Sequence, residues 1–181
     1  DNWLKSTIET IRNYRNIYSE KNTKNPIYNI ADKIKNKLPI IYADSSSFLI
    51  AAIRLKGQLA ENSKILAYHN ELPELNHNEI VGWENNLDLL SNFVVLWLKD
   101  SSDNPRVKNR QLITNKILKE INIKQYNISV DGNSFEERFL HMIHFGDWLS
   151  FWCALLLRTD PSPVHKINRL KDELSLINDP S

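Results

Sequence analysis

The run Phe93-Val94-Val95-Leu96-Trp97-Leu98 constrains the fold more than any other stretch of this sequence. All of its residues are apolar, so a strand made from it has no polar face. A sheet with one face in water needs apolar and polar residues to alternate, whereas the strands of a parallel sheet are covered by helices on both faces. The run therefore predicts a strand of a parallel sheet with helices on both sides.

The rest of the chain supplies segments that suit such a sheet. Further strands are predicted at Leu38–Ala43, Lys64–His69 and Ile123–Val130. Apolar residues at helical spacing lie between and after these strands, at Phe48–Leu59, Val107–Glu120, Ser134–Arg158 and Val164–Leu176. Alternating strands and helices are typical of an α/β protein. We expect a three-layer αβα sandwich of the flavodoxin type with a mostly parallel sheet.

Two amphipathic segments, Asp1–Tyr18 and Ile27–Lys37, precede the first predicted strand. Both have the spacing of helices with one apolar face. We interpret residues 1–37 as an N-terminal helical segment and place the boundary of the α/β domain, residues 38–181, after it.

Composition excludes several classes of partner and site. The 181 residues carry 23 basic and 22 acidic side chains, a net charge of +1, so no long-range field favours nucleic acid or an anionic membrane. The single cysteine, Cys153, excludes an internal disulfide and a Cys-rich zinc site. The most apolar run, Trp148–Leu157, is too short to span a bilayer. We expect a cytoplasmic protein that binds neither nucleic acid nor membranes.

Polar residues gather after three of the predicted strands, at Asp44–Ser47, Asn70–Glu79 and Lys99–Asn104. The carboxyl ends of parallel strands share one edge of the sheet, where ligands of α/β proteins bind. At the first of these turns Ser45, Ser46 and Ser47 can offer hydroxyls to a phosphate or a sugar. Serine at a strand-to-helix turn is also an ordinary helix N-cap.

The third polar segment contains Asp100-Ser101-Ser102-Asp103, which indicates a solvated loop. No glycine-rich P-loop and no GxGxxG motif accompanies any of these segments, so the sequence gives little support for nucleotide binding.

The histidines predict no metal site. The spacing of His69, His77 and Glu79 matches no zinc pattern. His141 and His144 stand at i and i+3 of a predicted helix among aromatic residues, which favours a place in the core. His77, between two asparagines, has two interpretations: a proton shuttle near neutral pH, or an ordinary hydrogen-bonded histidine.

Four runs give the sequence a resemblance to a known family: LPIIYADSSSFLIAAIRLKGQLAENSK, ELPELNHNEIVGWE, GDWLSFWCALLLRTDPSPV and INRLKDEL. In this order they resemble the second half of the bifunctional phosphoglucose/phosphomannose isomerases, whose members consist of two sugar isomerase (SIS) domains. The PELNHNE block is the most specific, and the resemblance covers most of Leu38–Leu174.

This resemblance implies an aldose–ketose isomerase that interconverts glucose 6-phosphate, mannose 6-phosphate and fructose 6-phosphate without a metal or organic cofactor. Glu61 matches the family's catalytic base, which moves a proton between C2 and C1 through a cis-enediol. His77 matches the histidine that assists ring opening and, in a homodimer, reaches the partner's active site. Lys171 and Ser162 fall in the region that closes over the substrate, although the family usually has threonine where Ser162 stands.

The family's first SIS domain holds much of the sugar phosphate, and nothing in residues 1–37 resembles it. We therefore expect residues 1–37 to be the linker from an absent first domain, the phosphate-binding residues to lie in that domain, and this chain alone to have weak or no isomerase activity. Two other functions stay open. One is a non-catalytic, regulatory SIS module that binds sugar phosphates, and the other is an interaction domain that uses the aromatic stretch Trp148–Trp152.

Overall fold

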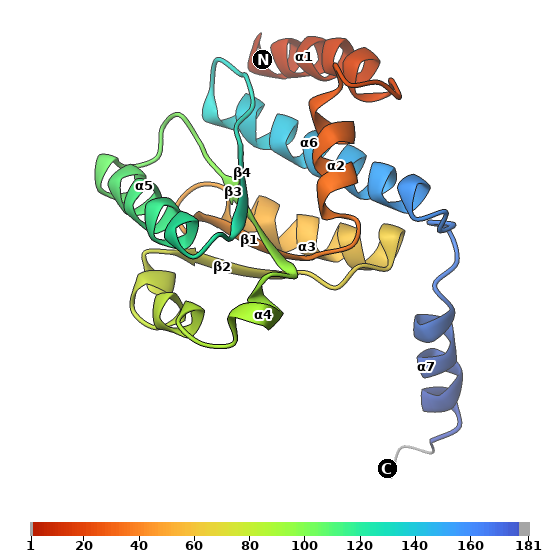
Figure 1. Cartoon of the computed structure of the whole chain (residues 1–181). Helices are drawn as coiled ribbons and strands as arrows, with labels where there is room; N and C mark the ends of the chain where they lie inside the picture. Colours follow the sequence, from red (N-terminus) through yellow and green to blue (C-terminus); the bar gives the residue numbers. More distant parts are fainter. Residues whose placement is uncertain (1, 178–181) are drawn as a thin grey trace.

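The computed structural model describes residues 2–177, in which helices surround a parallel sheet (Figure 1). In chain order the elements are α1 (Asn2–Tyr18), α2 (Pro26–Ile34), β1 (Leu38–Asp44), α3 (Leu49–Ser63), β2 (Tyr68–Leu72), the 3₁₀ turns η1 (Glu74–Asn76) and η2 (Glu79–Trp83), α4 (Leu87–Leu90), β3 (Phe93–Leu98), α5 (Pro105–Glu120), β4 (Lys124–Ile128), α6 (Phe135–Leu156) and α7 (His165–Ser175). The α/β class expected from the sequence is confirmed.

The strands described within residues 2–177 form one sheet in the order β2-β1-β3-β4, and every neighbouring pair is parallel. β1 and β3 lie in the middle, with Ile41 opposite Leu96. The chain leaves the sheet toward one face after β1 and toward the other after β3. The sheet edge between these two loops is thus the position where ligands of α/β sheets usually bind.

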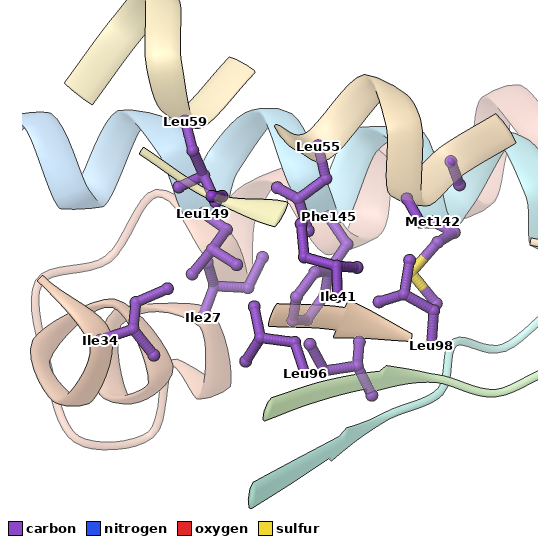
Figure 2. Close-up of a cluster of buried hydrophobic side chains, with 14 of the residues drawn as sticks. Ile27, Ile34, Ile41, Leu55, Leu59, Leu96, Leu98, Met142, Phe145 and Leu149 are labelled. Atoms are coloured by element: carbon purple, nitrogen blue, oxygen red, sulfur yellow. The ribbon is translucent and has the colours of Figure 1, made fainter. Parts of the chain in front are cut away.

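Successive residues of β1 and β3 bury their side chains on opposite faces of the sheet. Ile41 and Leu96 pack in one apolar cluster with α2, α3 and α6, as Figure 2 shows. Tyr42 and Trp97 pack in a second cluster, together with residues of η1, η2, α4 and α5. This alternation explains why neither strand has a polar face.

The expected strand at Lys64–His69 is wrong in position, because β2 spans Tyr68–Leu72. Helix α3 runs on to Ser63, and the amide of Ile65 still donates to the carbonyl of Leu59 at 3.0 Å. Pairing with β1 begins only where Tyr68 meets Ile40. β2 lies at the edge of the sheet, so its polar residues need no apolar cover, and their hydrophilic character hid the strand.

The N-terminal helices pack directly against the α/β layers. In α2, Ile27 and Ile34 are fully buried in the same cluster as Ile41, and α1 and α2 both lie against α6. The side chain of Asn25 caps α2 by accepting from the amides of Ile27 and Tyr28. Residues on both sides of the boundary placed after residue 37 therefore share one hydrophobic core.

The segment Asp100–Asp103 is not the solvated loop that the sequence indicated, because both aspartates are buried. Arg138 of α6 donates to Asp100 through Nε at 2.6 Å and through Nη2 at 3.0 Å. Together with the hydrogen bonds from Ser102, this pairing holds the pKa of Asp100 at about 2, although burial opposes the shift. The ion pair joins the carboxyl end of β3 to α6.

Two features of the C-terminal part complete the fold. Cys153 of α6 is buried in the apolar cluster, and burial raises its pKa to about 12.

Helix α7 extends away from the other elements beyond the end of α6 (Figure 1), and none of its residues is buried.

Replacing Ile27 by alanine tests whether α2 belongs to the domain core. Since the side chain is fully buried, we expect Ile27→Ala to lower the free energy of unfolding by about 2–5 kcal/mol. Ile17 of α1, which is 46% exposed, supplies the matched control, and Ile17→Ala is expected to cost less than about 1 kcal/mol. Urea unfolding of both variants gives the comparison, and equal small losses would contradict a core role for α2.

Replacing Asp100 by asparagine leaves Arg138 without its buried partner. We expect a loss of about 3–5 kcal/mol at pH 7, against about 0–1 kcal/mol for Asp147→Asn in the exposed pair with Arg54. The folded pKa of Asp100, about 2, lies below the value of about 3.9 for an unfolded chain, so the stabilisation exists above pH 4 and is lost as the pH falls toward 2. Urea unfolding between pH 7 and pH 2.5 should show that the difference in free energy of unfolding between Asp100→Asn and wild type becomes smaller as the pH falls. A difference that does not change with pH would contradict a stabilising role for the Asp100 charge.

Candidate functional site

Glu61 lies in the last turn of α3, and its side chain is exposed. Helix α3 starts after the carboxyl end of β1 and ends before the amino end of β2, so Glu61 is near the amino edge of the sheet. Among the described residues, its carboxylate has no hydrogen bond and no ion pair. It is therefore available to a ligand or a proton.

A groove of about 410 Å³ opens beside Glu61. One wall is the end of α3 and the residue after it, with Ala60, Glu61 and Lys64, and the other is the start of α7 with the residues before it, Pro163–Ile167. The lining is mostly apolar, with one carboxylate, two lysines and His165 around it. This arrangement can hold an anionic ligand of moderate size next to a free base.

Two residues expected to contact substrate, Ser162 and Lys171, do not line this groove. The amide of Ser162 donates to Asp160 Oδ1 at 2.9 Å, and the side chain of Ser162 is exposed. Lys171 lies farther along α7 and is also exposed. Lys64 and Lys166 take the lining positions. Sequence reasoning missed both, and the only signal for Lys64 was its place at the end of the AENSK run.

His77 follows η1 on the other face of the sheet. Its neighbour Leu75 belongs to the second apolar cluster, whereas α3, with Glu61, packs on the first. It also follows the carboxyl end of β2, so it stands at the opposite edge from Glu61, and β2 alone spans roughly 15 Å. One chain therefore does not bring Glu61 and His77 into a common groove.

The polar residues around His77 are largely used within the fold. Glu79 accepts hydrogen bonds from the Tyr42 hydroxyl and from Asn70 Nδ2. Asn76 Nδ2 donates to Thr114 Oγ1 at 2.9 Å, and Asn78 Nδ2 donates to Glu74 Oε1 at 3.0 Å. The side chain of His77 is exposed and has no such partner within residues 2–177. These bonds fix the loop and leave His77 pointing to the surface.

The loops after β1 and β3 meet at the carboxyl edge, as expected from the sequence. The Ser47 hydroxyl donates to Asp103 Oδ1 at 2.6 Å, and Ser46 donates to Asp44 Oδ1 through both its amide and its hydroxyl at 3.0 Å. Burial raises the pKa of Asp103, and the charge of Asp44 adds to this shift. Two of the three serines proposed as substrate contacts thus already bind carboxylates of the chain itself.

Asp44 adds a further carboxylate at this edge of the sheet. It is buried, and its Oδ2 has no hydrogen-bond partner among the described residues. Lys99, at the end of β3, is partly buried, and this burial lowers its pKa. This edge of the sheet is therefore rich in buried carboxylates, which make an unfavourable environment for a phosphate group.

Among the remaining histidine candidates, His69 and His144 are partly exposed, and His141 lies in the interior. His141 is buried between the Tyr18 hydroxyl, 2.9 Å from Nε2, and the Asp131 carbonyl, 2.8 Å from Nδ1, and burial lowers its pKa. Across residues 2–177, no three His, Cys, Asp or Glu side chains are grouped so that they could hold a metal ion. No helix in that range is both long enough and apolar enough to cross a bilayer.

Comparison with known proteins identifies relatives over most of the chain. Residues 23–174 match the family model of the bacterial phospho-glucose isomerase C-terminal SIS domain. The chain is 38% identical over 181 residues to a bifunctional phosphoglucose/phosphomannose isomerase of Caldicellulosiruptor bescii, with 99% of this chain and 53% of the relative aligned. The Aquifex aeolicus protein of the same name is 42% identical over 145 residues, which are 80% of this chain and 45% of that protein.

A solved structure supports the same fold. The glucose-6-phosphate isomerase-like protein of Thermus thermophilus aligns with a TM-score of 0.74 at 16% identity, covering 88% of this chain and 54% of that one. The chain thus spans about half the length of the curated relatives it matches. From the match to residues 23–174, the chain belongs to the family of bacterial phosphoglucose isomerase C-terminal SIS domains.

Proposed function

We propose that this chain is the base-bearing half of an aldose–ketose isomerase acting on glucose 6-phosphate, mannose 6-phosphate and fructose 6-phosphate. The observation that carries the proposal is the free Glu61 carboxylate in a groove with two lysines. Both curated relatives are named bifunctional phosphoglucose/phosphomannose isomerase, and this name supports phosphorylated glucose and mannose as the substrate class.

In this mechanism Glu61 takes the proton from C2 of the open-chain aldose. The electron pair moves to the carbonyl and forms an enediolate, a proton passes from O2 to O1, and Glu61 then returns its proton to C1 to give the ketose. The enediolate carries negative charge, so a cation beside it lowers the barrier. Lys64 and Lys166 line the groove and can supply this charge, whereas Lys171 is not among the lining residues.

His77 acts in the same proposal as the acid and base for ring opening, in the site of a second copy. The separation of Glu61 and His77 within one chain supports an arrangement in which each site combines Glu61 of one protomer with His77 of its partner. A two-fold symmetric dimer would contain two such sites. The enzyme would serve carbohydrate metabolism, including glycolysis, in the cytoplasm.

A first SIS domain completes the proposed enzyme and holds the phosphate. Two observations support this part: the chain spans about half of its relatives, and the serine loop of its own sheet is occupied by Asp44 and Asp103. We therefore propose residues 1–37 as the connection to that domain, Ser45–Ser47 as minor contacts at most, and weak or no turnover by the isolated chain.

Replacing Glu61 by glutamine tests the base. In a protein that joins this chain to the first half of the Caldicellulosiruptor bescii relative, Glu61→Gln should lower kcat by about 10²–10⁴-fold in a coupled assay of fructose 6-phosphate conversion. The exposed carboxylate has no partner among the described residues, so the melting temperature should stay the same. Glu84→Gln, at another exposed glutamate, is the control. Retained turnover in Glu61→Gln would support a regulatory sugar-phosphate module instead.

Mixing two inactive variants tests the role of His77. Because each site would take Glu61 from one copy and His77 from the other, mixed dimers of Glu61→Gln and His77→Ala should regain one intact site. Random exchange of subunits should then restore about a quarter of wild-type activity. Mixtures that stay inactive, although mass spectrometry shows mixed dimers, would place both residues in the same protomer's site or remove His77 from the mechanism.

A further inference from the structure

Lys64 adopts a backbone conformation that is unfavourable for any residue with a Cβ atom. It follows α3 with φ 58° and ψ 29°, the left-handed region, and its amide donates to the carbonyl of Leu59. Glycine takes this helix-ending position at lower energy than any residue with a Cβ atom. A lysine here is therefore not explained by the helix end alone, and its side chain needs a separate reason.

The side chain links two segments that are far apart in the sequence. Lys64 Nζ donates to the carbonyl of Glu61 in the last turn of α3 and to the carbonyl of Pro161, 3.4 Å away, in the linker before α7. Within residues 2–177, the bond to Pro161 is the one hydrogen bond that joins residues 160–177 to the rest of the chain. The ammonium thus ties both walls of the groove together.

Helix α7 has no other firm attachment to position it within the described part of the chain. None of its residues is buried, and its apolar residues Ile167, Leu170 and Leu174 are exposed. A helix of 11 residues is marginal in isolation, and its direction depends on what holds its first turn. Lys64 contacts the linker just before that turn.

We propose that Lys64 is a positioning residue that sets the direction of α7 and the width of the groove beside Glu61. The proposal deepens the isomerase function and rests on it only where it concerns turnover. An ammonium group has three donors, and the two carbonyls use two of them, which leaves one for an oxygen of the sugar. Through this link the wall formed by Pro163–Ile167 would be held at a fixed separation from the base.

The first test measures the direction of α7 in the 181-residue chain. Spin labels on cysteines introduced at Lys56 of α3 and Asn168 of α7 report the distance between the two helices by pulsed electron paramagnetic resonance. We expect Lys64→Gly to broaden the distance distribution, because it removes the link and keeps a residue suited to φ 58°. Lys64→Arg, which can still donate to both carbonyls, should keep the distribution narrow.

Asn122→Gly is the matched control, since Asn122 has φ 62° after α5 and no side-chain hydrogen bond among the described residues. It should leave the distribution unchanged. Circular dichroism shows whether each variant is folded, and Lys64→Gly should melt at the wild-type temperature or above it. A distribution in Lys64→Gly as narrow as in wild type would overturn the proposal.

The second test measures turnover in the joined two-half protein. We expect Lys64→Gly to lower kcat/KM by about 10–100-fold, since small displacements of a groove wall cost this much, and Lys64→Arg to recover most of the loss. If neither the wild type nor any variant converts the substrate, the proposed isomerase function is wrong, and the distance measurement still tests the role of Lys64. Lost activity with an unchanged distance distribution would show a direct chemical role and overturn positioning.

Discussion

The burial of β1 and β3 on both faces is the constraint on which the rest of the structure depends. Two apolar faces require two layers of cover, and the chain supplies them as α2, α3 and α6 on one side and α4, α5 and the 3₁₀ turns on the other. Parallel pairing then forces each connection to return to the amino edge. Because α3 is such a returning helix, its last turn, with Glu61, lies at that edge, while the loop with His77 leaves from the opposite one.

Predictions from the sequence were right where neighbouring residues determine the structure, and they failed where contacts between distant residues determine it. The strand at Phe93–Leu98 and the helix predicted to begin near Ser134 are determined by neighbouring residues, and both predictions were right. At the start of that helix the Ser134 hydroxyl accepts from the Glu137 amide at 3.2 Å. β2 was misplaced because an edge strand needs no apolar pattern. The ion pair of Asp100 with Arg138 joins residues 38 positions apart, so no local pattern could indicate it.

The candidate site shows the same division. Family resemblance alone singled out Glu61, and for His77 it favoured a catalytic role where the residues themselves had left two interpretations open. The structure adds which of their neighbours are free. Around His77 the polar side chains hydrogen-bond with one another, and Ser46 and Ser47 hydrogen-bond with Asp44 and Asp103. A stretch rich in polar residues can therefore indicate a loop stabilised by its own hydrogen bonds as well as a binding site.

The single cysteine has a practical consequence. Cys153 is buried on the core side of α6, and its raised pKa keeps the sulfur protonated at neutral pH, whereas the thiolate is the species that reacts with alkylating reagents and oxidants. The folded chain should thus survive mild oxidation unchanged, and reagents should label it only when the helical layer opens. The rate at which Cys153 is alkylated therefore measures how often this opening occurs.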